Sequence, residues 1–481
     1  SVDELKREIT PSFHAVLNDW MYGKKSSKFS DPDYVFKITY VTPPLKAFVD
    51  SILKKLDYFG VVGGPLRRGF GFGKTHSMTF LWHLLTSEAY FRSPIKISEE
   101  IVRQTLVLGV DASVGKLIQT IMDELKTYIN PRHTIGKIKD PALIRAIANV
   151  IKERSDKDYP TTAKELAELI AEILSRYRDL GGNPRLLVLA DEVGFGILQR
   201  LRGYAESIKA GLTQKAKEAY AEAEIFVDFL SDLYDALNKI QPSAVVIWAW
   251  AEQDRKEMET LMDRHADNKE IHDKIRGIVN ELDVLIQRYS RAIGGLGVEQ
   301  FSYDPGHAIE IALYRVLEYI GSENLEEIKE EYLRRLGEIS KQLNLNEIFD
   351  RYKNDLRRYY PFSLGLINLL KKIMDNRDLP NTEFERSVIQ IEDIAADNAL
   401  RLNPEGTYTL SVDHLVEMDK VVPVDLMGEN FKTEWLSIVK DVELALRSIE
   451  DDNAKKAASI AAKYIFAKGA TADFLTLIES N

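Results

Sequence analysis

Short apolar runs recur along the chain, and each has the length of a buried strand. Three of them are clear and span residues 105–110, 186–190 and 244–251. A shorter run begins at Gly60, just before a glycine-rich segment, and residues 298–303 form a weaker candidate. Continuous apolar runs, in contrast to alternating ones, are typical of strands that are buried on both faces of a sheet.

Helical spacing fills the intervals between these runs. Apolar residues recur three and four positions apart from position 45 to 53, and residues 163–178 and 214–237 have the same period. Buried strands that alternate with helices predict an α/β protein with a doubly wound parallel sheet. The interval 112–184 is longer than one crossover needs, so we expect a helical insertion there.

These patterns divide the chain into four predicted parts. An N-terminal helical or linker segment precedes the α/β core, a mainly helical lid follows it, and the chain ends in a mixed region. The mixed region contains one strand-like piece at residues 407–412 and a helical piece near its end. The predicted boundaries are 1–50, 51–303, 304–400 and 401–481.

Composition narrows the class of protein. Hydrophobic residues make up 45% of the 481 positions and charged residues 29%, which is enough apolar material for a large core. No apolar run approaches the ~20 residues that a membrane-spanning helix needs, and the charged start SVDELKREIT is not expected to be a signal peptide. Cysteine is absent, which excludes disulfides, thiol catalysis and Cys-ligated zinc. We expect a cytoplasmic protein with no membrane partner.

Charge and histidine spacing weigh against two further classes. The net charge is −11, from 64 basic and 75 acidic side chains, whereas proteins that bind nucleic acid through its phosphates usually carry a basic surface. A local basic groove remains compatible with this composition, so direct DNA binding stays open. The eight histidines show no compact metal-ligand spacing, and we expect no zinc site.

The most informative segment follows the first short run. Glycines without a Cβ let backbone N–H groups turn inward around phosphates, and a helix N-terminus favours the same anion. We therefore expect a loop that binds the phosphates of ATP, in which Lys74 contacts the β- and γ-phosphates and the Thr75 hydroxyl binds Mg²⁺. The residues of this predicted loop are Gly69, Phe70, Gly71, Phe72, Gly73, Lys74, Thr75 and His76.

Two other interpretations of this segment were weighed. The pattern G-x-x-x-x-G-K-[ST] has Arg68 at its first position, with the glycine displaced to position 69, so a glycine-rich turn without a ligand is one alternative. A dinucleotide fingerprint is excluded, because its last glycine would fall on Lys74. The strand–loop–helix context favours the phosphate-binding loop.

A pair of acids supplies the second half of the predicted site. The run 186–190 leads directly into Asp191 and Glu192. A phosphoryl-transfer site needs a carboxylate near the magnesium and a group that orients the attacking water. We expect Asp191 to hold Mg²⁺ through water and Glu192 to orient or deprotonate the nucleophile. A strand end with solvated acids is the alternative.

Further polar residues follow the run 244–251, which we expect to lie between the other two strands of the site. Gln253 comes just after that run, and we expect it to contact the γ-phosphate; an ordinary polar strand exit is the alternative. Arg288 and Arg291 precede the weaker strand 298–303. They are candidates for a finger that stabilises transition-state charge in a neighbouring subunit, and a solvated helix face is the alternative.

The combined motifs resemble a family of AAA-type ATPases known as domain of unknown function family 499. The loop GFGFGKTH and the helix residues Leu81, Trp82, His83 and Leu84 are similar to that family. The segment before the loop is similar at Pro11, Ser12, Phe29, Asp31, Pro32, Phe36, Thr39, Tyr40, Thr42 and Leu45. Downstream, Tyr360, Pro361 and Phe362 match a YPF segment, with Ser363 and Leu364 where the family has histidine and proline.

The resemblance implies a P-loop NTPase fold of AAA type that hydrolyses ATP with Mg²⁺ and assembles as a homo-oligomer. It also implies a role in prokaryotic antiviral defence, with a methyltransferase, helicase or nuclease as partner. Members of the family are longer, so we expect either a compact member or an N-terminal portion.

Two competing functions share the same motifs. One is a low-turnover nucleotide-binding scaffold that regulates a partner nuclease or methyltransferase, and the other is a DNA translocase motor. An intact Lys74, Thr75, Asp191 and Glu192 favours hydrolysis over the scaffold, and the acidic net charge weighs against the motor.

Overall fold

The computed structural model divides the chain into two compact units, which are described separately. One comprises Thr10–Ser302, and the other comprises Tyr303–Asn481 together with Ser1–Ile9. The predicted strands 298–303 and 407–412 lie outside the described residues. The described residues are 11–66, 73–154, 159–291, 307, 309–311, 313–315, 325–363, 366–367, 416–417, 420–421, 440–441, 444–455 and 458.

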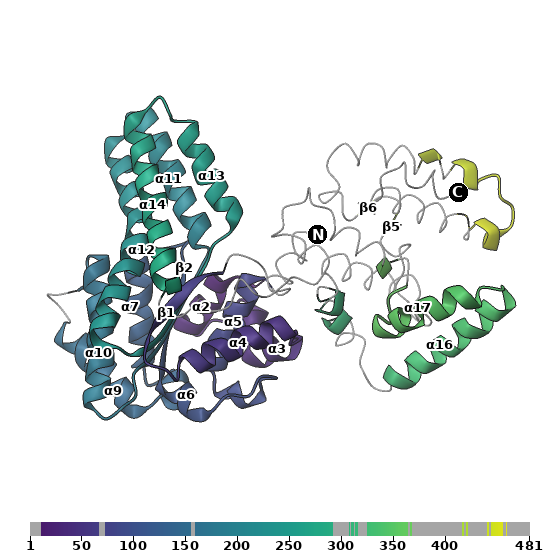
Figure 1. The fold of residues 1–481 in the computed structure, drawn as a ribbon, viewed down its shortest axis with the longest axis horizontal. Helices are drawn as coiled ribbons and strands as arrows, with labels where there is room; N and C mark the ends of the chain where they lie inside the picture. The colour runs from purple at the N-terminus through teal and green to yellow at the C-terminus, as the bar shows by residue number, and fades with distance from the viewer. Residues whose placement is uncertain are drawn as a thin grey trace. The chain divides into compact units, whose positions relative to one another are not determined.

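A four-stranded parallel sheet forms the centre of the first unit (Figure 1). Its strands are β1 (Gly60–Leu66), β2 (Thr105–Asp111), β3 (Arg185–Asp191) and β4 (Ser243–Ala249). The spatial order is β1-β4-β3-β2, so β4 lies between β1 and β3. The predictions of a parallel sheet and of a central position for the run 244–251 are both confirmed, although β4 ends at Ala249.

Every residue of β2, β3 and β4 is buried, as their continuous apolar runs predict. Alternate residues of β2, such as Leu106 and Leu108, belong to one core with the helices that follow β2. Gly109 points to the opposite face, where Leu17 of α2 (Phe13–Tyr22) and Trp82 of α5 (Lys74–Thr86) pack on it. The sheet is therefore covered by helices on both faces.

Helices from the N-terminal part of the chain cover the face next to Gly109. They begin with good caps, because Ser12, Asp31 and Thr42 each accept a hydrogen bond from a backbone N–H of the first helical turn. Residues 11–55 thus pack on the sheet within the same compact unit. The further elements here are η1 (Lys28–Ser30), α3 (Pro32–Ile38), α4 (Pro43–Lys55), η2 (Glu88–Arg92) and α6 (Glu99–Gln104).

The interval between β2 and β3 is helical, and its helices pack on the opposite face of the sheet. Helix α7 also covers the free edge of β2. Its Tyr128 hydroxyl donates to the Val107 carbonyl at 2.6 Å, and its Glu124 carboxyl accepts from the Gly109 N–H at 2.9 Å. These bonds satisfy backbone groups that an edge strand would otherwise expose. The helices are α7 (Leu117–Tyr128), α8 (Ile135–Ile138), α9 (Pro141–Glu153) and α10 (Ala163–Asp179).

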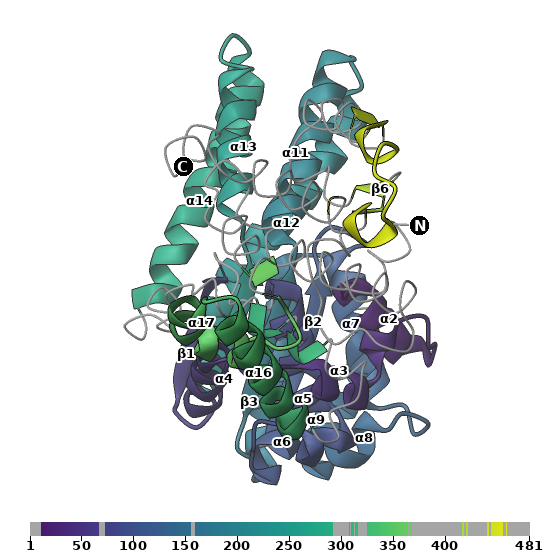
Figure 2. The same ribbon diagram turned by 90° about the vertical axis from the view of Figure 1, so that its right-hand side faces the viewer.

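A second set of helices follows β3 and β4 and extends from one end of the sheet (Figures 1 and 2). We call this set the helical projection. The sequence predicted a helix at 214–237 but placed the extra helices only in the interval 112–184. The helical projection consists of α11 (Val193–Lys209), α12 (Thr213–Ile240), α13 (Glu252–Asp263) and α14 (Lys269–Arg291).

The described part of the second unit is mainly helical, as the sequence predicts. It contains α16 (Leu325–Gln342) and α17 (Asn346–Arg358), and a short antiparallel pair of β5 (Val416–Glu417) and β6 (Lys420–Val421). Across the described ranges of both units, no helix combines the length and apolar character needed to cross a membrane.

A buried lysine connects the ends of three segments in the first unit. The Nζ atom of Lys139 donates to the carbonyl oxygens of Leu85, Val102 and Thr105 at 2.6, 2.6 and 2.7 Å. Leu85 lies in the last turn of α5, and Val102 lies in α6. The cation therefore satisfies carbonyls at the base of β2, where burial lowers its own pKa to about 7.

The contact at Gly109 gives a test of the packing between the sheet and the N-terminal helices. A Cβ at this position would lie 2.7 Å from Leu17 Cδ2 and 2.9 Å from Trp82 Cζ3, whereas a Cβ at Gly64 on β1 would meet no atom within 4 Å. We expect Gly109→Ala to lower the free energy of unfolding by roughly 1–3 kcal/mol, because the packed side chains around position 109 must move to accommodate the added methyl group. Urea denaturation measures this, with Gly64→Ala as the matched control. Equal stability of the two variants would contradict the described packing.

Candidate functional site

The four strands end at the same level, which collects their carboxyl-terminal residues at one edge of the sheet. Leu66 at the end of β1 pairs with Ala249 of β4, and Asp111 at the end of β2 pairs with Asp191 of β3. The segment after each strand therefore starts from this edge. Ligands of open α/β sheets bind outside the carboxyl ends of the strands, so this edge is the place to look for a site.

Helix α5 starts at this edge, directly after the predicted phosphate-binding loop. Gly73 has φ 70°, a conformation that favours glycine, and it precedes Lys74 and Thr75 in the first helical turn. Gly73 is the N-cap residue and has no side chain that could cap the helix, an arrangement that suits anion binding at a helix N-terminus. The other glycine-loop residues, 69–72, lie outside the described residues.

The fold brings together Thr75 and Asp191, the two residues that are predicted to bind Mg²⁺. The Thr75 side chain lies close enough to the Asp191 carboxylate to lower its pKa, and the Glu192 N–H donates to Asp191 Oδ1 at 3.0 Å. Asp191 is almost fully buried. Burial and the negative charges of Glu192 and Asp111 raise the pKa of Asp191 to about 7, although Thr75 and the Glu192 N–H act in the opposite direction.

This pair fits a magnesium ion. A hydroxyl and a buried carboxylate are hard oxygen ligands of the kind that Mg²⁺ takes together with phosphate oxygens and water. A divalent cation would also relieve the repulsion that keeps the pKa of Asp191 high. Within the described ranges, no group of three or more His, Cys, Asp or Glu side chains is arranged to hold a metal, so the ion would depend on the nucleotide for further ligands.

Glu192 marks the sharp turn from β3 into α11. Its backbone has φ 52° and ψ 28°, the left-handed conformation that non-glycine residues rarely adopt. Its carbonyl accepts the Gly196 N–H at 2.8 Å, which starts the helix. A residue held in this conformation is a feature of functional sites, where the surrounding structure offsets the strain.

Two glycines allow α11 to begin so close to its neighbours. A Cβ at Gly196 would lie 2.3 Å from the carbonyl oxygen of Ala112, which follows β2. A Cβ at Gly194 would lie 2.5 Å from Oδ2 of Asp254. The start of α11 therefore fits between the exit of β2 and the first turn of α13 only without these side chains.

Asp254 is a residue of the site that the sequence analysis missed. It lies in the first turn of α13, accepts a hydrogen bond from the Ala251 N–H at 3.3 Å, and interacts electrostatically with Lys74. Burial raises its pKa, and the charge of Lys74 partly offsets that effect. The signal in the sequence was an acid just after the third clear apolar run, one position beyond the predicted Gln253.

Gln253 itself points elsewhere. It is exposed, and its amide donates to Glu257 Oε1 at 3.1 Å, one turn further along α13. Because β4 ends at Ala249 and α13 starts at Glu252, position 253 belongs to a helix and not to the strand exit that the sequence suggested.

The two histidines of α5 face the N-terminal segment. His76 Nε2 lies 2.9 Å from the Thr39 hydroxyl, and His83 Nε2 lies 2.8 Å from the Phe29 carbonyl. Both rings are buried, and burial lowers the pKa of His83 to about 4. A contact of position 76 with a nucleotide would therefore come from its backbone.

Arg288 and Arg291, the two candidate finger residues, lie at the C-terminal end of α14. Arg288 contacts α12 of its own chain, with Nη1 3.2 Å from Ser231 Oγ and 3.8 Å from Asp235 Oδ2. Its side chain remains 44% exposed, which leaves part of the guanidinium accessible. Arg291 is the last residue of α14, and its side chain is outside the described part.

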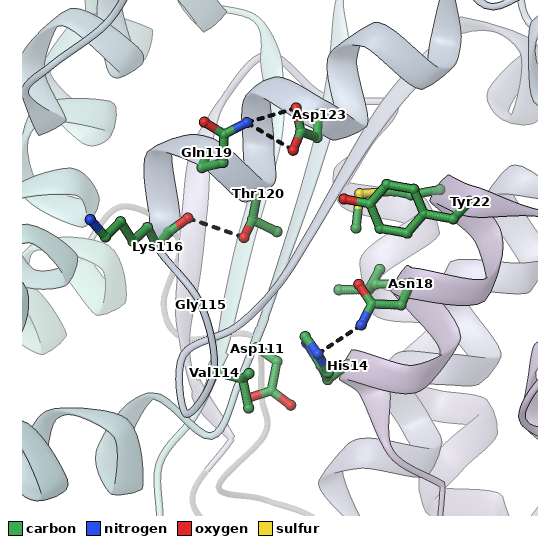
Figure 3. A pocket seen from close by; sticks show the side chains of 12 residues that line it. His14, Asn18, Tyr22, Asp111, Val114, Gly115, Lys116, Gln119, Thr120 and Asp123 are labelled. Carbon is green, nitrogen blue, oxygen red and sulfur yellow. Dashed lines mark hydrogen bonds between the residues drawn. The ribbon is translucent and has the colours of Figure 1, made fainter. Parts of the chain in front are cut away.

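A cavity of about 250 Å³ opens beside Asp111 (Figure 3). His14, Asn18 and Tyr22 of α2 form one wall, and Gln119 of α7 lies on the other. The cavity lies next to the carboxyl-terminal end of β2, and none of the predicted site residues lines it. The remaining lining residues are Leu17, Met21, Val114, Gly115, Lys116, Thr120 and Asp123.

Comparisons with protein-family models, with curated proteins and with solved structures find no match to this chain. The fold that is established is an α/β protein with a parallel sheet of order β1-β4-β3-β2, flanked by helices and followed by a helical region. The site must therefore be interpreted from its own geometry.

The raised pKa of Asp191 predicts a pH-dependent cost in stability. The folded protein holds a proton on this carboxyl up to about pH 7, whereas its ordinary value is 3.8. Folding is therefore penalised increasingly as the pH rises from about 4 to 7. In the presence of EDTA, we expect Asp191→Asn to be more stable than the wild type at pH 8, with a difference that shrinks toward pH 5.

Urea denaturation between pH 5 and pH 8 measures this difference. Asp263→Asn, an exposed position at the end of α13, is the control and should show no such trend. A variant of Asp191 that is less stable than the wild type at every pH would contradict the assigned environment.

Proposed function

We propose that this protein is a Mg²⁺-dependent ATPase. The observation that carries the proposal is the placement of Thr75, in the first turn of α5, beside the buried Asp191 at the end of β3. In P-loop NTPases, a hydroxyl on the phosphate-facing helix and a carboxylate at the end of a nearby strand hold the nucleotide-bound Mg²⁺. Lys74 and Glu192, each adjacent to one member of this pair, supply the cation and the base.

In this mechanism each side chain has a separate task. Lys74 neutralises the β- and γ-phosphates, and the first-turn N–H groups of α5 bind the phosphate oxygens. Thr75 and Asp191 would hold Mg²⁺, which would supply positive charge beside the γ-phosphate. Glu192, which starts α11 next to Asp191, orients the attacking water and accepts its proton. The elements that carry these groups all start from one edge of the sheet.

The proposal includes a fold assignment and an assembly. The central position of β4 between β1 and β3 supports an AAA-type P-loop NTPase, in agreement with the resemblance of the loop. We propose a homo-oligomer in which Arg291 or Arg288 completes a neighbouring subunit's site. The same resemblance suggests a motor or switch role in prokaryotic defence, beside a methyltransferase, helicase or nuclease.

The first prediction concerns binding. Lys74→Ala should weaken ATP binding by ~30-fold or more, because loss of one partner from a close charge pair costs on the order of 2 kcal/mol or above. Isothermal titration calorimetry with MgATP measures it, and Lys54→Ala, exposed on α4, is the control. Normal affinity in the Lys74 variant would rule out the phosphate-binding loop.

The second prediction concerns turnover. Glu192→Gln should retain ATP binding and lower steady-state hydrolysis by ~10²-fold or more, as expected for removal of a general base. Glu206→Gln, exposed on the same helix, should behave as the wild type. A wild type that binds ATP with negligible turnover would favour the regulatory scaffold, and unchanged turnover in the variant would place the base elsewhere.

A further inference from the structure

Arg200 of α11 is a mostly buried arginine whose guanidinium binds backbone carbonyls. Its Nη1 donates to the carbonyl oxygens of Ala112 and Gly196 at 2.6 and 2.9 Å, and its Nη2 donates to that of Gly115 at 3.3 Å. The side chain is only 12% exposed. Ala112 and Gly115 belong to the segment that follows β2, so one side chain of α11 holds the exit of another strand.

These bonds close a hydrogen-bonded ring around the turn that follows β3. The Ala112 N–H donates to the Asp191 carbonyl at 2.9 Å, and the Gly196 N–H donates to the Glu192 carbonyl at 2.8 Å. Arg200 Nη1 joins the carbonyls of Ala112 and Gly196. The peptide bond between Asp191 and Glu192 completes the ring, so the guanidinium forms a second connection between these two acids.

The ring surrounds a residue whose backbone is strained. Glu192 has a φ of 52°, a left-handed conformation that persists only where the surrounding structure holds it in place. A guanidinium that donates to both carbonyls fixes α11 against the exit of β2. It thereby fixes the direction in which α11 leaves Glu192.

We propose that Arg200 is a positioning residue for Glu192. This inference rests on the proposed ATPase function, in which Glu192 orients the attacking water and accepts its proton. Loss of the two Nη1 bonds would let α11 move against the exit of β2 and would displace the Glu192 carboxylate. Lys74 and the first turn of α5 lie outside the ring, so turnover should fall far more than nucleotide affinity.

Contacts of Arg200 with α12 offer a purely structural alternative. Its Nε lies 3.5 Å from Oε2 of the half-exposed Glu222, and its guanidinium carbon lies 5.4 Å from the centre of the Phe226 ring. If Arg200 served only to dock α11 on α12, loss of the ion pair would resemble loss of the carbonyl bonds. Glu222→Gln removes the ion pair and leaves the three carbonyl bonds available, so it is the matched control.

The experiment compares Arg200→Met with Glu222→Gln. Methionine keeps an unbranched apolar stem beside Phe226 and removes every donor. We expect Arg200→Met to lower kcat for MgATP by ~10-fold or more, because a displacement of about 1 Å at a catalytic group can cost ~10²-fold. Its affinity for MgADP, measured by calorimetry, should stay within about threefold of the parent's, since the ring does not include the phosphate-binding groups. Glu222→Gln should retain both values, because exposed ion pairs contribute little.

A double-mutant cycle tests whether Arg200 acts through Glu192. In a Glu192→Gln background, Arg200→Met should have no further effect on the residual turnover, because the group that it positions is already absent. A purely structural role would instead lower the residual turnover by the same factor as in the parent. Urea denaturation shows whether each variant is folded. Arg200→Gln, whose shorter side chain cannot join the two carbonyls, is the second variant and should show the same loss of kcat.

The outcomes separate the inference from the proposed function. If the parent protein hydrolyses no ATP, the proposed function fails. If the parent hydrolyses ATP and folded Arg200 variants keep its kcat, the inference is wrong and the ATPase proposal stands. The same conclusion follows if Glu222→Gln loses as much turnover as Arg200→Met, or if the effects of Arg200→Met and Glu192→Gln multiply.

Discussion

The candidate site depends on one constraint, which is that the four parallel strands end at the same level. Thr75 and Asp191 are far apart in the sequence, and their side chains interact because β1 and β3 both pair with β4 and end beside it. A one-residue slip in a strand would send its side chains to the opposite face. Strands buried on both faces by different helices resist such a slip, so the core fixes the register and the register fixes the site.

The site itself works against stability. Asp191 is buried beside two other acids, and Glu192 adopts a left-handed backbone conformation. Both features cost free energy that the rest of the domain must offset. The offset comes from the helices on the two faces of the sheet and from buried polar contacts away from the site, such as those of Lys139 and Tyr128. Under the proposed function, Mg²⁺ and nucleotide would remove part of this cost, and their binding would stabilise the fold.

Two helices of the helical projection also start at this edge of the sheet. Helix α11 begins at Glu192 and α13 begins just before Asp254, so both start within the site and extend away from it. The glycines at 194 and 196 let them approach each other and the exit of β2 closely. Under the proposed function, a change in charge at the phosphates would therefore act at the starts of α11 and α13.

The sequence by itself determined the features that depend on local pattern. Apolar runs placed the buried strands to within a few residues, and Asp191 and Glu192 were found because they directly follow one of those runs. Tertiary packing decided the rest. The sequence pattern singled out Gln253 and not Asp254, because which side chain of the segment after β4 packs against α11 depends on where α13 starts. In the same way, the contact of Arg288 with α12 joins residues distant in sequence, and no periodic pattern reports such a contact.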